Sequence, residues 1–260
     1  MKIPLDVVHL IIQNLASDDN LDAIRACCLS SRMLVPMCRK HIFSSIELIQ
    51  RPTTDLDSSP PNVLSRFGQL LELNPLIATF IREMELSLPE KYHSEHELDF
   101  LQNLNHVKRF TFGFTDWNRK TSDPRPWSLV SGRIVAHLRS FIQRNDIVYF
   151  HLFGIDGFPL STFLTFSNLK YLVIQNVTSP TVDNTTDPPM SALLLKSLDF
   201  LEGSIQFAQQ SIAAKVFDLA NVDKLSIGLR SQDQMDALRS ILPPADRLKD
   251  LRISSTFGTF

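Results

Sequence analysis

Residues 169–174 read LKYLVI and residues 195–200 read LKSLDF, two stretches with apolar residues at their first, fourth and sixth positions. Five further stretches share this pattern: IREMEL from Ile81, VKRFTF from Val107, IVYFHL from Ile147, VDKLSI from Val222 and LKDLRI from Leu248. Successive starts lie 26, 40, 22, 26, 27 and 26 residues apart. A recurring step of roughly 20 to 50 residues predicts stacked supersecondary units.

The LxxLxL pattern at this period resembles that of leucine-rich repeats. Helical patterns separate the segments, and an eighth segment, FSSIEL, begins at Phe43. Strand and helix in alternation predict an α/β fold: a right-handed solenoid with one curved parallel sheet and helices on its outer face. The helical patterns cover residues 63–80, 95–104, 128–145, 205–220 and 232–242.

Residues 1–41 predict a separate helical domain ahead of an array that occupies residues 42–260. The first helix follows Pro4, the second spans about residues 21–29, and the third starts at Ser30 or Ser31 and runs to about His41. Apolar residues of the first helix cover an arc of about 160°, whereas one buried face needs roughly 100°. Three short helices cannot bury that surplus among themselves, so we expect it to contact another protein.

Composition narrows the function classes. The chain is 43% hydrophobic and 21% charged with a net charge of −2, which is typical of a folded protein and argues against nucleic acid or anionic membrane as the main ligand. Its three cysteines favour a reducing compartment, so we expect an intracellular protein of the cytoplasm or nucleus. The sequence contains no run of about 18 apolar residues, so we expect no membrane span.

The opening stretch resembles the F-box family. IPLDVVHLIIQNL at residues 3–15 is similar to its LPxELLxxIxxxL pattern, and CLSSR at 28–32, CRKHIF at 38–43 and NPLIATFIREMELSL at 74–88 are similar to later segments of fungal members. Leu34 stands where the family usually has tryptophan. The resemblance implies the substrate receptor of a cullin–RING ubiquitin ligase, which is not itself an enzyme and needs no cofactor.

The same resemblance implies which residues bind the Skp-type adaptor and, through it, a cullin. These residues share the core and the interface of the helical domain, and are Pro4, Leu5, Val8, Ile11, Ile12, Leu15 and Leu29.

The residues between the apolar positions of each LxxLxL segment are expected to point to the inner side of the sheet, where they predict a substrate-binding surface. Tyrosine and arginine are common energetic anchors of interfaces. We therefore expect an unknown protein substrate to contact a central patch of Arg109, Tyr149, His151 and Tyr171. An ordinary solvated sheet face is the alternative.

Other chemistry has little support. No phosphate-binding glycine loop or nucleophile elbow occurs, and HSEH at residues 93–96 lacks the further ligands that a zinc site needs. Two alternatives stay open: a scaffold without a ligase role, and a cysteine hydrolase. The chain ends just past the last segment without a polar terminal repeat, which favours a fragment of a longer array over a cap made by Phe257 and Phe260.

Overall fold

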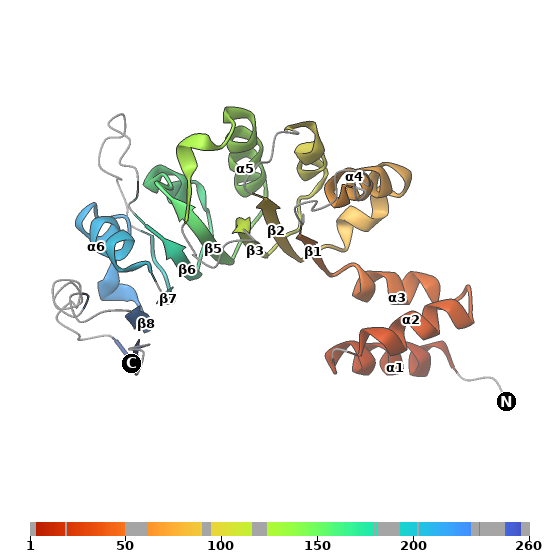
Figure 1. Cartoon of the computed structure of the whole chain (residues 1–260). Coiled ribbons are helices and arrows are strands. Elements are labelled where there is room, and N and C mark those ends of the chain that lie inside the picture. The colour runs from red at the N-terminus through yellow and green to blue at the C-terminus, as the bar shows by residue number, and fades with distance from the viewer. Residues whose placement is uncertain are drawn as a thin grey trace, which may run out of the picture.

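The computed structural model describes residues 4–18, 20–49, 62–89, 95–115, 124–178, 180, 193–201, 203–229, 234 and 248–255. Within these residues the chain is mixed α/β, and its nine strands form one parallel sheet. The sheet order is β1-β2-β3-β5-β6-β7-β8-β9, so each strand lies beside the next one along the chain, while the short β4 pairs with β5. The strands follow an arc, with helices α4, α5 and α6 on its outer side (Figure 1).

Each LxxLxL segment, including the one from Phe43, begins its strand at the third residue. The strands are β1 Ser45–Ile49, β2 Glu83–Pro89, β3 Arg109–Thr115, β5 Tyr149–Asp156, β6 Tyr171–Val177, β7 Ser197–Phe200, β8 Lys224–Leu229 and β9 Asp250–Ser255. The prediction of a parallel sheet is confirmed. The sequence did not indicate β4, Arg125–Pro126, which lies at the end of a charged, proline-containing stretch.

The core fills the side of the sheet that faces the helices. Side chains alternate between the two faces of a strand, and the fourth and sixth residues of the segments on β2, β3, β5, β6, β7 and β8 point into this core, whereas Leu251 and Ile253 on β9 are 43% and 46% exposed. Phenylalanines stack from strand to strand: the Phe110 ring lies 5.7 Å from that of Phe150 and 4.8 Å from that of Phe141 on α5. This continuous apolar layer holds neighbouring units together.

The connections between strands are shorter and more varied than the helical patterns predicted. Three α-helices occur in the described part of the outer layer, α4 Val63–Leu73, α5 Gly132–Arg144 and α6 Ile205–Ala213. Asn74 and Pro75 end α4, and Lys215 ends the α6 region with a left-handed φ of 55°. The predicted helix at 232–242 lies outside the described residues, except for residue 234.

A 3₁₀-helix, η2 Glu95–Asn103, replaces the α-helix that we predicted for residues 95–104. Leu98, Leu101 and Leu104 are fully buried and follow a spacing of three, which matches the three residues per turn of a 3₁₀-helix. Four further 3₁₀-helices occur in the described residues: η1 Pro75–Thr79, η3 Trp127–Leu129, η4 Leu160–Thr165 and η5 Leu219–Asn221.

Asn145, directly after α5, ties three backbone segments together and is only 2% exposed. Its Oδ1 accepts a hydrogen bond from the Val107 amide at 2.9 Å, and its Nδ2 donates to the carbonyls of Leu104 and Phe141, each at 2.9 Å. Buried backbone groups need such partners when no ladder bond reaches them. One side chain thus links the entry to β3 with the end of α5.

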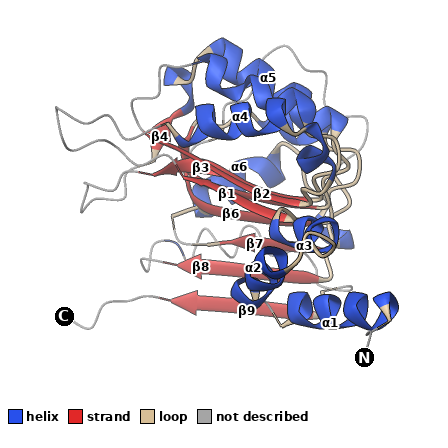
Figure 2. Cartoon of the chain, turned by 90° about the vertical axis from the view of Figure 1, so that its right-hand side faces the viewer, coloured by secondary structure: helices blue, strands red, loops and turns tan. Residues whose placement is uncertain are grey.

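Three helices precede the sheet and stand off from it beyond β1 (Figures 1 and 2). They are α1 Leu5–Ser17, α2 Leu21–Ser30 and α3 Val35–Ile42. Asn20 caps α2 by accepting a hydrogen bond from the Ala23 amide at 3.1 Å. The third helix starts at Val35 rather than at Ser30 or Ser31, because a turn closes from Leu34 to Ser31 and because Pro36 fits only the first helical turn.

Candidate functional site

The first candidate surface is an apolar flank on α1 and α2. The fully buried apolar core of the three helices consists of Ile12, Ile24 and Cys38. More large apolar side chains are exposed than buried in this unit, and Leu29 is 89% and Met33 73% exposed. We call the exposed set the helical flank; it comprises Leu5, Val7, Leu10, Ile11, Leu21, Leu29 and Met33.

The seven residues expected to bind an adaptor separate into three groups. Pro4, Leu5, Ile11 and Leu29 are exposed, whereas Val8 and Leu15 are half-buried. Ile12 is 1% exposed and belongs to the core of the unit. The separation is physical: one side of α1 packs on the other two helices, and only the rest of its wide apolar arc is left for a partner.

Sequence reasoning missed Leu10, Leu21 and Met33 as members of this flank. Val7 lies one turn before Ile11 on α1 and belongs to the apolar arc that the sequence predicts for this helix. Leu10 lies on the far side of α1 from Ile12, where the wheel predicts polar residues. Met33 lies in the turn between α2 and α3, so no helical periodicity marked it. Only the packed structure shows that these side chains are exposed.

The second candidate surface is the inner face of the sheet, on the side opposite the outer helices. Strand register places the inward letters of each segment in two rows that cross the sheet. The first row is Ser45, Glu83, Arg109, Tyr149, Tyr171, Ser197, Lys224 and Asp250, and the second is Glu47, Glu85, Thr111, His151, Val173, Asp199, Ser226 and Arg252.

The structure brings the four predicted patch residues together on β3, β5 and β6. Arg109, Tyr149 and Tyr171 are consecutive members of the first row, and His151 follows Tyr149 in the second. The Arg109 guanidinium lies 4.3 Å from the centroid of the Tyr149 ring, and its Nε is 3.5 Å from a carboxylate oxygen of Glu83. Tyr171 is 41% exposed, so its ring is open to a ligand.

Burial shifts the pKa values of two side chains on this face, His151 and Tyr149. Desolvation lowers the pKa of His151, and a hydrogen bond from or to Gln175 at 3.2 Å opposes that shift only in part. Desolvation also raises the pKa of Tyr149, although the neighbouring Arg109 lowers it. At neutral pH both side chains are therefore uncharged, and they offer hydrogen bonds and ring surface rather than charge.

A hollow opens on this face beside β1. Glu47 and Glu85 are register partners there, and desolvation together with the Glu47 charge raises the pKa of Glu85. The hollow is polar and carries both signs of charge; it is lined by Ser45, Ile46, Glu47, Glu83, Met84, Glu85, Arg109, Thr111 and Tyr149.

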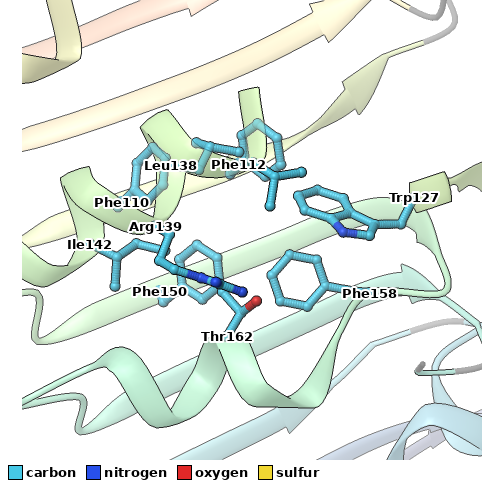
Figure 3. A pocket seen from close by; sticks show the side chains of 10 residues that line it. Phe110, Phe112, Trp127, Leu138, Arg139, Ile142, Phe150, Phe158 and Thr162 are labelled. Atoms are coloured by element: carbon cyan, nitrogen blue, oxygen red, sulfur yellow. The ribbon is translucent and has the colours of Figure 1, made fainter. Parts of the chain in front are cut away.

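A second pocket lies between the sheet and α5 (Figure 3), where aromatic side chains converge from β3, β5 and η3. Arg139 and Thr162 are the polar side chains among those that line it. The Trp127 ring packs edge-on against Phe158 at 4.9 Å and against Phe112 at 6.3 Å. These contacts are typical of a packed apolar core, and the residues that line the pocket do not form a catalytic site.

Within the described ranges no group of three or more histidine, cysteine, aspartate or glutamate side chains could hold a metal ion. His93 of the HSEH stretch lies outside those ranges, whereas His96 points toward Asp99 with 3.7 Å between Nδ1 and a carboxylate oxygen. Cys27 and Cys28 are half-buried and Cys38 is buried, and all three are free thiols. Burial raises the pKa of the Cys38 thiol, which disfavours the nucleophilic thiolate.

No protein-family model matches this chain, and a search of the curated proteins finds no match either. The helical flank and the inner face of the sheet are therefore the basis for assigning a function. Among the helices in the described ranges, none is long and apolar enough to cross a membrane.

Proposed function

We propose that this chain is the substrate-recognition adaptor of an SCF-type ubiquitin ligase. In this proposal residues 1–41 are an F-box that binds a Skp-type adaptor, and residues 42–260 are a leucine-rich-repeat solenoid that binds a protein substrate. The observation that carries the proposal is the helical flank: seven large apolar side chains are at least 41% exposed on a unit with three buried core residues. Such an apolar surface on a small unit needs a protein partner.

The position of the flank supports the F-box interpretation. The residues that resemble the family pattern lie on α1 and α2, and Leu5, Ile11 and Leu29 among them are exposed. The array follows directly, since β1 begins three residues after α3 ends. One strand per unit, paired in chain order, supports the solenoid interpretation.

The mechanism is proximity rather than chemistry. The helical unit would hold the ligase while the inner face holds the substrate, which raises the effective concentration of substrate lysines near the activated ubiquitin. The inner face suits this role because Tyr149, Tyr171 and Arg109 supply ring surface and charge at its centre. The protein would act inside the cell, in the cytoplasm or the nucleus.

The test measures binding of a purified Skp-type adaptor to the full chain. Replacing Ile11 and Leu29 together by aspartate should weaken binding by at least about 100-fold, since interface anchors contribute about 2 kcal/mol or more each. The matched control replaces Leu73 and Leu76 by aspartate; these side chains are 86% and 67% exposed on the array, outside the helical flank. Circular dichroism checks that both variants fold.

Three results would overturn the proposal: no adaptor binding by the unmodified chain, unchanged binding by the flank variant, or equal losses in both variants. The first result would favour a leucine-rich-repeat scaffold without a ligase role. Substrate capture is measured separately, with Tyr149 and Tyr171 both replaced by alanine. That variant should lose captured substrate and keep the adaptor, because the two surfaces lie on separate elements.

A further inference from the structure

A row of positive charge follows the edge of the sheet at which the strands begin. Backbone hydrogen bonds place one residue per strand in this row: the Lys108 amide donates to the Arg82 carbonyl at 2.7 Å, and the Lys196 amide donates to the Lys170 carbonyl at 2.8 Å. The same ladder continues through Val148 and Asp223 to the last strand. We call its five cations the basic edge: Arg82, Lys108, Lys170, Lys196 and Lys249.

The charge of this edge is only partly neutralised by its surroundings. Lys108 pairs with Asp146, and Lys249 Nζ lies 2.8 Å from a carboxylate oxygen of Asp223. Hydrogen bonds from these lysines lower the pKa of both carboxyls, and the charges of Lys170 and Lys196 lower them further. Among the residues that the structure describes, five cations of this edge thus pair with two carboxylates in a chain whose net charge is −2, so positive charge is concentrated locally.

The geometry of the edge restricts the partner. Neighbouring strands lie about 4.8 Å apart, so the seven strands from β2 to β9 on the main path span about 29 Å. Side chains on one face of an α-helix recur every turn, about 5.4 Å, whereas those on one face of an extended chain recur about every 6.6 Å. The helical spacing is the closer match to the spacing of the strands.

We propose that the basic edge binds the acidic face of an α-helix in the protein substrate. The inference rests on the proposed function, because it names the kind of substrate segment that the array would receive. Helix carboxylates one turn apart would meet ammonium and guanidinium groups one or two strands apart. A helix of about 19 residues has the length of the edge measured along the arc of the sheet.

A nucleic acid fits this surface less well than an acidic helix. The hollow on the inner face of β1 and β2 carries Glu47, Glu83 and Glu85 next to the basic edge. A duplex has phosphates around its whole circumference and would meet these carboxylates, whereas a helix with one acidic face keeps its charge on the edge alone. The overall negative charge of the chain acts in the same direction.

The experiment measures binding of a fluorescein-labelled 20-residue peptide by anisotropy, with about five glutamates on one helical face. An isomeric peptide has the same composition with its glutamates distributed around the helix. Reversing Lys170 and Lys196 to glutamate should weaken binding of the first peptide by at least about tenfold. The matched control reverses Arg66 and Arg139, two exposed arginines on α4 and α5, and should bind as the unmodified chain does.

Each outcome of this experiment either supports or overturns the proposed binding of an acidic helix. A loss confined to the Lys170 and Lys196 variant, a preference for the one-faced peptide and weaker binding at higher salt would support the proposal. Equal binding of both peptides, an unaffected lysine variant, or tighter binding of a 20-base-pair DNA duplex would overturn it. Replacing Lys170 and Lys196 by glutamine gives the same test without reversed charge. Adaptor binding is measured on every variant, so that failure of the ligase proposal is recognised separately.

Discussion

Replacing Asn145 by alanine should cost about 4 to 6 kcal/mol of the free energy of unfolding. The change removes three hydrogen bonds of 2.9 Å from a side chain that is 2% exposed. Each such bond contributes about 1 kcal/mol net, and the buried Val107 amide left without its acceptor adds about 1 to 3 kcal/mol. A domain of this kind has about 5 to 15 kcal/mol in total, so the variant should be close to unfolding.

Urea denaturation followed by circular dichroism measures this loss, and hydrogen exchange at the Val107 amide reports the local part of it. The control replaces Asn103, an exposed asparagine at the end of η2, and should change stability by less than about 0.5 kcal/mol. Replacing Asn145 by aspartate keeps the acceptor but places a carboxylate against the Leu104 and Phe141 carbonyls, and should be at least as damaging at pH 7. A loss below about 1 kcal/mol for the alanine variant would show that Asn145 does not hold these three backbone segments together.

A methyl group at Gly113 would lie 2.3 Å from the Phe153 carbonyl oxygen, so alanine there should cost about 1 to 3 kcal/mol in a thermal melt; an unchanged midpoint would contradict the packing. The raised pKa of Glu85 means that the folded state binds its proton more tightly than the unfolded state does, so the folded state loses stability as the pH rises. Replacing Glu85 by glutamine should therefore raise the urea midpoint at pH 7 but not at pH 3. The lowered pKa of His151 has the opposite effect, because protonation of this side chain below about pH 6.5 favours the unfolded state. A His151→Gln variant should therefore lose less stability than the unmodified chain when the pH falls from about 7.5 to about 5.5. Equal losses in the two proteins would contradict this prediction.

The strands could be predicted from the sequence because their signal is local. Each of the eight segments begins its strand at the third residue, and the first letters at Ile81, Val107 and Ile147 are at most 1% exposed. The helical patterns were less reliable, since residues 95–103 form a 3₁₀-helix and the stretch from residue 63 to 80 breaks at Pro75. Over so few residues, the spacing of apolar residues does not distinguish a 3₁₀-helix, with three residues per turn, from an α-helix, with about 3.6.

The candidate surfaces show the same division. The alternation of apolar and polar residues predicted which side chains face inward, yet Val173 is only 9% and Ser197 only 8% exposed, so a place on the inner face does not by itself expose a side chain. The helical wheel predicted a surplus of apolar surface on the first helix but could not assign Ile12 to the core and Leu10 to the surface. That assignment depends on where the second and third helices pack.

The strands, their parallel order along the chain and the apolar side of most strands follow from the amino-acid pattern alone, since they depend on spacing within a few residues. The stacking of Arg109 on Tyr149, the three hydrogen bonds of Asn145 and the alignment of the basic edge become visible only in the folded chain. Those contacts join residues from different units, and connections of unequal length leave their register undetermined until the strands pair.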